Sequence, residues 1–225
     1  METIKFKEEL LNQWFNKISY IDKEKREFLL EFANEYLNRN IQELYDINKA
    51  INNKLDIYKD DIVTLIYKTR EESYIFEINN NSCKFEYFQA KEVVMGIIDI
   101  IEDILPLGTV VNLKKECLDK LLKGKNIEKA EIVIVNRFIF QNGVDSYFHY
   151  AGVVYPLGFI NNANTIHFTS NLIEDVVHKG YSDEKEDAYI YMVKRELIIE
   201  RGMKSFSFAS KEEGNEYLEK VKAGV

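Results

Sequence analysis

Apolar residues recur at helical spacing along the first part of the chain. Phe6, Leu10, Trp14 and Ile18 fall on one face of a helix expected over about residues 4–20, because this spacing places side chains on the same side of a helix. The helical pattern resumes after a charged turn and extends over about residues 23–55. The chain is therefore expected to begin with a helical pair.

The second expected helix has a heptad character. Leu30, Leu37, Leu44 and Ile51 are seven residues apart, as in the apolar seam of a coiled coil. The companion positions of the heptad are Ala33, Asn40 and Ile47. Three heptads are the shortest pattern that indicates a coiled coil. The pattern favours a helix packed within its own molecule and leaves open a seam that pairs with a second chain.

Alternating β-branched and aromatic residues predict three strands after the helices, at about residues 62–67, 74–78 and 83–88. Short polar segments separate them, so an antiparallel meander is expected. A further helix is expected at about residues 89–104, because Pro106 then stops the helical pattern. Residues 1–103 are thus predicted to form an α+β region.

Two Pro-Leu-Gly tripeptides mark the second half of the chain. They contain Pro106 with Gly108 and Pro156 with Gly158. Proline presets φ for a turn, and a glycine two positions later can adopt a positive φ. Strand-like runs surround both turns, so we expect a small, strongly bent, barrel-like antiparallel β unit in residues 104–209 of an α+β protein.

Helices are also expected towards the C-terminus. Asn171 and Glu174 resemble a capping box for a helix at about residues 171–179. Ser182 precedes an acidic first turn of a helix at about residues 183–200. Residues 210–225 are expected to form a terminal helix.

Composition restricts the function classes. The net charge is −8, and residues 1–103 hold 14 basic against 21 acidic residues, which argues against nucleic-acid binding. No apolar run reaches the roughly 18 residues of a membrane span, and the first residues do not resemble a signal peptide. Two well-separated cysteines, Cys83 and Cys117, favour reduced thiols. A cytoplasmic protein is expected.

The candidate chemistry is sparse. The histidines His149, His167 and His178 show no metal-ligand spacing, and no nucleophile elbow, phosphate loop or dinucleotide motif occurs. We therefore predict no catalytic residue, metal or cofactor; Cys117 with one of the histidines is a weaker alternative. The chain has 14 Tyr and 14 Phe, and surface tyrosines favour protein interfaces. The candidate interface is Tyr147, Phe148, Tyr150 and Tyr155.

Several segments of the second half resemble domain-of-unknown-function family 4176. The resemblance rests on residues 105–114, 132–137, 147–158 and 173–184, and it covers about residues 104–190. It departs from the family pattern at residues 116–130, which intervene between two strands, and it leaves the first hundred residues outside. Members of this Firmicutes family are encoded beside type VII secretion genes and LXG-domain toxins.

The resemblance implies a function in protein binding. We expect a non-enzymatic cytoplasmic adaptor or chaperone that binds an LXG-type toxin or its small helical targeting partners before export. An immunity protein that neutralises the toxin domain is the alternative, since an acidic protein can be steered towards a basic active site. An enzyme of unrecognised class is a third. The family supplies no catalytic residues, and the oligomeric state stays open.

Overall fold

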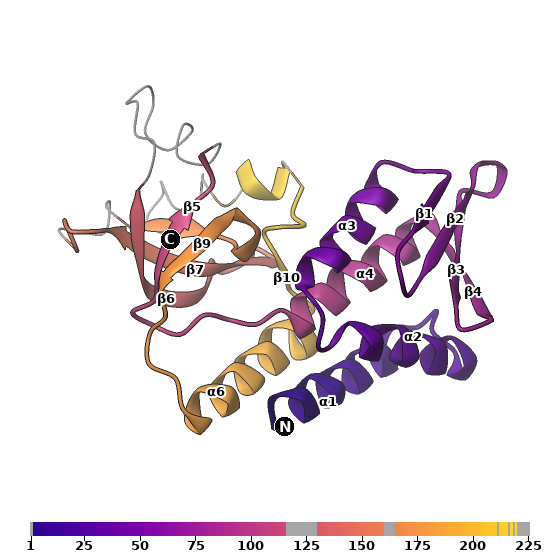
Figure 1. Cartoon of the computed structure of the whole chain (residues 1–225), viewed down its shortest axis with the longest axis horizontal. Coiled ribbons are helices and arrows are strands. Elements are labelled where there is room, and N and C mark those ends of the chain that lie inside the picture. Colours follow the sequence, from indigo (N-terminus) through magenta and orange to yellow (C-terminus); the bar gives the residue numbers. More distant parts are fainter. Residues whose placement is uncertain are drawn as a thin grey trace. The chain divides into compact units, whose positions relative to one another are not determined.

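The computed structural model describes residues 2–115, 130–159, 165–210, 212–215, 217 and 219. The chain divides into two compact units (Figure 1). Unit 1 contains Met1–Glu102 and Lys194–Arg201, and unit 2 contains Asp103–Val193 and Gly202–Val225. The boundary after residue 102 agrees with the predicted end of the N-terminal α+β region. Residues 194–201 differ from the prediction, because they were assigned to the β-rich region of residues 104–209 and belong to unit 1.

Unit 1 places helices against one face of an antiparallel sheet. The strands follow the order β1-β2-β3-β4, and a short 3₁₀ turn at Thr69–Glu71 joins β2 to β3. The strands are β1 (Ile57–Lys59), β2 (Thr64–Lys68), β3 (Ser73–Ile78) and β4 (Asn81–Glu86). The helices are α1 (Glu2–Lys17), α2 (Lys23–Tyr36), α3 (Ile41–Asn52), α4 (Tyr87–Ile101) and the π-helical segment Arg195–Glu200.

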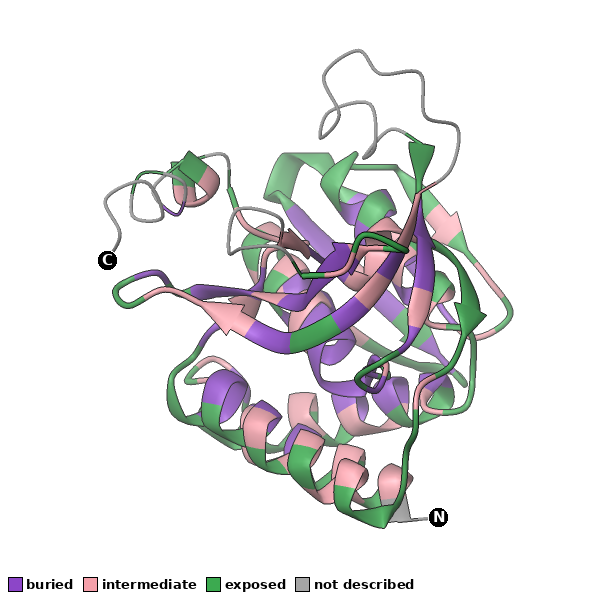
Figure 2. Cartoon of the chain, turned by 90° about the vertical axis from the view of Figure 1, so that its left-hand side faces the viewer, coloured by how far each residue is buried: buried purple, intermediate pink, exposed green. Residues whose placement is uncertain are grey.

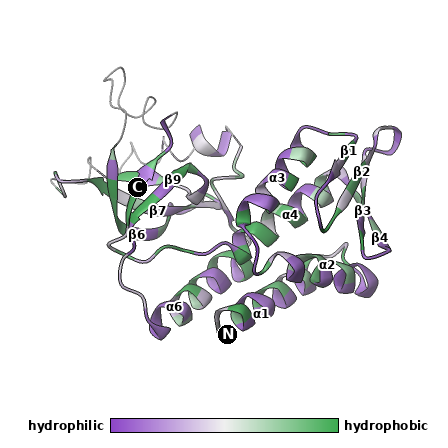
Figure 3. Cartoon of the chain, viewed as in Figure 1, coloured by the Kyte–Doolittle hydropathy of each residue, from purple (hydrophilic) through white to green (hydrophobic). Residues whose placement is uncertain are grey.

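The meander predicted from the alternation is confirmed by β2, β3 and β4. Helix α4 begins at Tyr87, two residues earlier than expected, because Glu86 and Gln89 form a capping box. Phe88 therefore lies on the helix and not on a strand, and its side chain is 76% exposed. Helix α1 carries alternating hydrophilic and hydrophobic residues, as an amphipathic helix does (Figure 3).

The prediction of a single helix over residues 23–55 is wrong. Two helices, α2 and α3, occupy this range, and they are separated at Asn40. The Asn40 side chain accepts a hydrogen bond from the backbone N–H of Gln42 at 3.0 Å, so it caps α3 instead of occupying a heptad position. A continuous heptad seam for a second chain therefore does not exist. Its remaining positions Ala33, Leu44, Ile47 and Ile51 are buried, and Leu30 and Leu37 are half-buried.

Unit 2 is built around a second sheet, in the strand order β10-β7-β6-β5-β9, with β8 paired to β7. The hairpin predicted at Asn142-Gly143 joins β6 to β7, and Gly143 has a φ of 75°. The strands are β5 (Val110–Leu113), β6 (Glu131–Phe140), β7 (Ser146–Val154), β8 (Ile166–Phe168), β9 (Ile173–His178) and β10 (Lys204–Ser205).

The sheet of unit 2 is bent but is not a closed barrel, which corrects the barrel-like expectation. Bulges interrupt the β6–β7 and β5–β9 registers, and bulges bend a strand and increase its twist. Within the described residues, β9 and β10 end the sheet on opposite sides. The sheet stays open because β10 pairs in parallel with β7 and not with β9.

The prediction of a helix at residues 171–179 is also wrong, because most of this segment forms β9. Asn171 does not cap a helix; its side chain accepts hydrogen bonds from the hydroxyls of Thr169 and Ser207. Val176 is β-branched and lies opposite Val111 on β5, so a strand partner decides the conformation in place of the local capping pattern.

The helix expected at residues 183–200 is observed as α6 (Glu184–Lys194) followed by the π-helical segment Arg195–Glu200. The Asp183 side chain caps α6 by accepting from the N–H groups of Lys185 and Glu186. Leu197 is buried, whereas Tyr189 is 40% exposed. The helix expected in residues 210–225 begins at Ser210, which forms a capping box with Glu213; most of its length lies outside the described residues.

Within unit 1, a buried lysine holds the C-terminal end of α4. Lys194 is only 3% exposed, and its ammonium group donates to the carbonyl oxygens of Ile100 at 2.9 Å and Glu102 at 2.6 Å. A positive charge is favourable at a helix C-terminus, where carbonyl groups lack partners. The Glu102 carboxylate is buried as well and accepts from the Tyr45 hydroxyl.

Candidate protein-interaction surface

The four aromatic residues expected to form an interface are divided between the core and the surface. Tyr147 and Tyr150 have no exposed surface, whereas Tyr155 is 57% exposed. The Tyr150 hydroxyl accepts a hydrogen bond from the N–H of Leu105 at 3.0 Å, and its ring lies 5.3 Å from that of Phe168. The structure therefore does not place Tyr147 and Tyr150 on a binding surface. Figure 2 shows long stretches of buried residues along the strands of unit 2.

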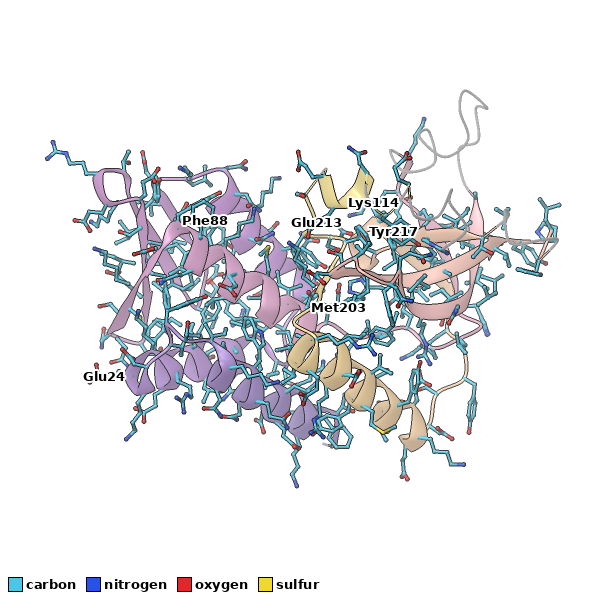
Figure 4. The ribbon with its side chains drawn as sticks, turned by 180° about the vertical axis from the view of Figure 1, so that it is seen from behind. Glu24, Phe88, Lys114, Met203, Glu213 and Tyr217 are labelled. Carbon is cyan, nitrogen blue, oxygen red and sulfur yellow. The ribbon has the colours of Figure 1, made fainter. Side chains whose placement is uncertain are left out.

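Phe148 lies between these extremes, in an aromatic cluster with His167, Phe206 and Tyr217. Its ring stacks on Phe206 at 4.2 Å and meets Tyr217 edge-on at 5.1 Å. The Tyr217 hydroxyl lies 2.6 Å from Nδ1 of His167. Tyr217, which Figure 4 labels, is 4% exposed, so this cluster packs the C-terminal segment onto the sheet and leaves Phe148 little surface for a partner.

The surface near Tyr155 is larger than the sequence analysis indicated. Leu157 is 66% exposed and Phe159 is 63% exposed. Together with Tyr155, three large apolar side chains are therefore exposed at every second position of this segment. We call residues 155–159 the β7 turn. Leu157 and Phe159 were missed, although the apolar residues on both sides of Pro156 and Gly158 were a signal that could have found them.

The backbone of the β7 turn is fixed by its own hydrogen bonds. The N–H of Tyr155 donates to the carbonyl of Glu131 at 2.8 Å, and the N–H of Gly158 donates to that of Val154 at 3.0 Å. Gly158 has a φ of 67°, which confirms the positive φ expected there. An ordered backbone reduces the conformational entropy that a partner must remove on binding.

The first Pro-Leu-Gly turn carries a smaller exposed apolar group. Gly108 has a φ of 78°, again as expected, and its N–H donates to the carbonyl of Ile134 at 2.9 Å. Gly180 packs so closely on this turn that an added Cβ would lie 2.1 Å from the carbonyl oxygen of Leu107. Leu107 is 49% exposed and Tyr181 is 82% exposed, so the close approach at Gly180 brings their chain segments together.

A buried ion pair connects the sheet of unit 2 to α6. The guanidinium group of Arg137 on β6 is 6% exposed and contacts the Glu186 carboxylate through both of its terminal nitrogens. It also lies over the Tyr189 ring, 5.1 Å from the ring centre, at a distance suited to a cation–π contact. Nothing in the local sequence pattern indicated that Arg137 is buried; only the fold brings the three residues together.

The three histidines do not converge. His149 is fully buried, and its Nδ1 accepts from the N–H of Ser170 at 3.0 Å. The Ser170 hydroxyl lies 3.0 Å from the same nitrogen, but a substrate has no access to a side chain without exposed surface. His167 belongs to the aromatic cluster, where burial lowers its pKa, and His178 is exposed on β9.

The remaining candidates for chemistry are equally isolated. Cys83 lies in unit 1 at a pocket of about 530 Å³ that Lys25 and Glu86 also line. Burial raises the pKa of its thiol, which makes it a poor nucleophile at neutral pH. Cys117 lies outside the described residues. Among the described residues, no group of three or more His, Cys, Asp or Glu side chains is arranged to hold a metal ion, and no helix is long and apolar enough to span a membrane.

Comparison with protein families identifies the segment that carries the β7 turn. Residues 104–189 match the family described as Domain of unknown function (DUF4176). This confirms the resemblance noted over about residues 104–190. The DUF4176 match covers β5 to β9 and the first part of α6 and leaves unit 1 outside. The searches of curated proteins and of solved structures returned no match.

Proposed function

We propose that this protein is a non-enzymatic cytoplasmic adaptor or chaperone that binds a type VII-secreted LXG-type toxin, or its small helical targeting partners, before export. Two observations support the proposal. The first is the DUF4176 match at residues 104–189. The resemblance to this family is what suggested a function in type VII secretion. The second is the β7 turn, which displays apolar side chains to the solvent and carries the argument for protein binding.

The chemistry of the β7 turn suits an apolar partner surface. Tyr155, Leu157 and Phe159 are each more than half exposed, and exposed apolar side chains that gather in one segment can mark an interaction site. Aromatic anchors contribute disproportionately to binding, and they do so best when their backbone is ordered. An amphipathic helix, such as those expected in LXG targeting domains, offers a matching apolar stripe.

The alternative is an immunity protein, which the net charge of −8 favours. Acidic proteins associate faster with the basic active-site region of a nuclease or a similar toxin. The two functions differ in the toxin segment that is bound. An adaptor binds the N-terminal targeting domain, whereas an immunity protein binds the C-terminal toxic domain and protects a cell that expresses it.

The test is co-expression of the full chain with each LXG-type toxin and small helical protein encoded near its gene, followed by size-exclusion chromatography. We expect a stable complex with the targeting domain, and at least tenfold weaker binding for the double variant Leu157→Ser/Phe159→Ser, since truncated hot-spot residues each cost more than about 1 kcal/mol. Phe88→Ser is the control, because Phe88 is an exposed aromatic residue, at 76%, that lies in unit 1.

Three other outcomes have distinct meanings. The absence of a complex with every neighbouring toxin and targeting protein would reject the adaptor function. A complex that the double variant leaves unchanged would reject the β7 turn as its site. Binding to the isolated toxic domain, with protection of the producing cell, would replace the adaptor by an immunity protein.

A further inference from the structure

The sheet of unit 1 has one face that the helices do not cover. Along β2 and β3, the buried residues Leu65, Tyr67, Tyr74 and Phe76 occupy one face. Thr64, Ile66, Ile75 and Glu77 alternate with them and point to the opposite face, since successive side chains of a strand alternate. We call this second face the open face of the sheet.

Three isoleucines form a row across the open face. The strand register places Ile57 of β1 opposite Ile66 of β2, and Ile66 opposite Ile75 of β3. Ile57 is 66% exposed, and Ile66 and Ile75 are half-buried. The outward side of an antiparallel sheet is usually polar. Three β-branched apolar residues in register at outward positions therefore indicate a surface that is covered by something.

A row with one basic and one acidic residue lies beside the isoleucine row. Lys59 lies opposite Thr64, and Thr64 lies opposite Glu77, so the neighbouring row reads basic, neutral, acidic from β1 to β3. Among the described residues, neither Lys59 nor Glu77 takes part in an ion pair or a side-chain hydrogen bond. Glu77, Thr64 and Ser82 line a shallow pocket of about 440 Å³, which can receive a long side chain.

We propose that the open face binds a second copy of this chain, about a two-fold axis that runs along β2. Such an axis exchanges the positions of β1 and β3 between the copies. It places Ile66 against Ile66 of the second copy and Ile57 against Ile75 of the second copy. It also brings Lys59 to Glu77 of the second copy, in the pocket beside Thr64, and symmetry makes this ion pair twice.

The arrangement of charge identifies the occupant. A two-fold interface must be self-complementary, so each basic group needs an acidic group at the symmetry-related position. The isoleucine row and the Lys59–Glu77 pair are both centred on the same strand, β2, and meet this requirement. The exposed Lys84 at the far end of the isoleucine row lies beyond the contact, on β4, and pairs with Glu71 of its own chain.

The size of the surface sets the strength of the dimer. Neighbouring strands are about 4.8 Å apart, so the isoleucine row spans roughly 10 Å. A contact of this width buries less than the roughly 1,200 Å² of total surface that stable complexes reach, and small interfaces are weak. We expect a dissociation constant on the order of 10–100 μM, corresponding to a dimer that forms only at high local concentration. Lys68 meets its own symmetry mate at the rim, where its long side chain reaches solvent.

The experiment is sedimentation of the purified full chain over a concentration series, with charge-reversal variants. Lys59→Glu and Glu77→Lys should each weaken the dimer by about tenfold or more, because each places like charges opposite one another. An equimolar mixture of these two variants should dimerise again, since every contact between unlike copies is then complementary. Lys49→Glu, which changes an exposed charge on α3, is the matched control and should have no effect.

Two further variants test the apolar row and the axis. Ile66→Lys should abolish the dimer while circular dichroism shows the sheet intact, and Lys68→Thr should tighten it. A chain that stays monomeric at the highest concentration reached, about 500 μM, overturns the proposal. A dimer that is insensitive to the charge reversals also overturns it, by indicating another contact such as the unpaired edge of β1. Failure of the mixed variants to dimerise excludes the axis along β2.

Discussion

The two sheets of this protein differ in how far their two faces are buried. In unit 1, β2 and β3 bury every second residue against the helices and leave the other face open. In unit 2, β7 is buried along seven of its nine residues, from Ser146 to Val153 with the exception of Phe148. Strand β7 has partners on both edges, namely β6 on one side and β8 and β10 on the other. Strands β2 and β3 are also paired on both edges, so the covering of the two faces of a strand, and not its pairing, decides whether its aromatic residues are available to a partner.

This difference explains why Tyr147 and Tyr150, two of the four residues predicted to form an interface, are buried, whereas Tyr155 is exposed. Tyr147 and Tyr150 lie on β7, which is paired on both edges and buried along most of its length, whereas Tyr155 lies just beyond its end. An aromatic-rich sequence gives no information about strand order. The exposed apolar surface of unit 2 therefore begins where β7 ends, and that of unit 1 lies on a strand face.

The largest expected effects come from truncating neighbouring residues in the two sheets. In β3, Phe76→Ala should lower the free energy of unfolding by about 3–5 kcal/mol, and Ile75→Ala by only about 1 kcal/mol, because Phe76 is fully buried and Ile75 lies on the open face. In β7, Tyr147→Ala and Phe148→Ala should both cost about 3 kcal/mol or more. Urea unfolding measures all four variants. A small loss for Phe148→Ala would show that the aromatic cluster is not part of the packed core.

Smaller effects are expected at the Pro-Leu-Gly turns of unit 2. Gly108→Val and Gly158→Val should each lower the free energy of unfolding by about 1–3 kcal/mol, since both glycines have a positive φ that a β-branched residue tolerates poorly. Gly214→Ala is the control, because no atom lies within 4 Å of its added Cβ. Equal thermal midpoints for Gly158→Val and the unchanged chain would contradict the turn geometry.

The smallest effect is a pH dependence that only unit 2 should show. Burial lowers the pKa of His167, so the unfolded chain binds more protons than the folded chain between the two pKa values. Stability therefore rises with pH in this range: the contribution is complete above about pH 6.5 and is lost as the pH falls below it. Urea midpoints between pH 7.5 and 5 measure this loss, and His167→Gln should reduce it. An unchanged slope in that variant would assign the effect to another group.

Local patterns in the sequence were sufficient for much of the fold. Alternation identified β2 to β4, and the Pro-Leu-Gly tripeptides identified two positive-φ turns, because these features depend on neighbouring residues alone. The capping pattern at Asn171 failed because a strand partner, β5, offered pairing that outweighed it. Asn40 was read as a heptad position although asparagine is also a preferred helix cap.

The candidate surfaces could be identified only from the three-dimensional fold. Arg137 lies 49 residues before Glu186 in the sequence, and no pattern indicated that it contacts Glu186 and Tyr189 on α6. Ile66 and Ile75 stood in predicted strands and Ile57 stood outside them, and only the register shows that the three residues form a row. Outward isoleucines at strand positions that should be polar were the signal that could have revealed the open face.

The buried Lys194 has a consequence for the order in which the protein acquires its structure during synthesis. Its ammonium group completes the end of α4 at Ile100 and Glu102, yet about 90 residues separate it from that helix in the chain. A ribosome adds about 5–20 residues per second, so α4 waits on the order of 5–20 s for this group. The whole segment that matches DUF4176 emerges during this interval. Unit 1, although it contains the N-terminus, is therefore completed only after most of unit 2 has been translated.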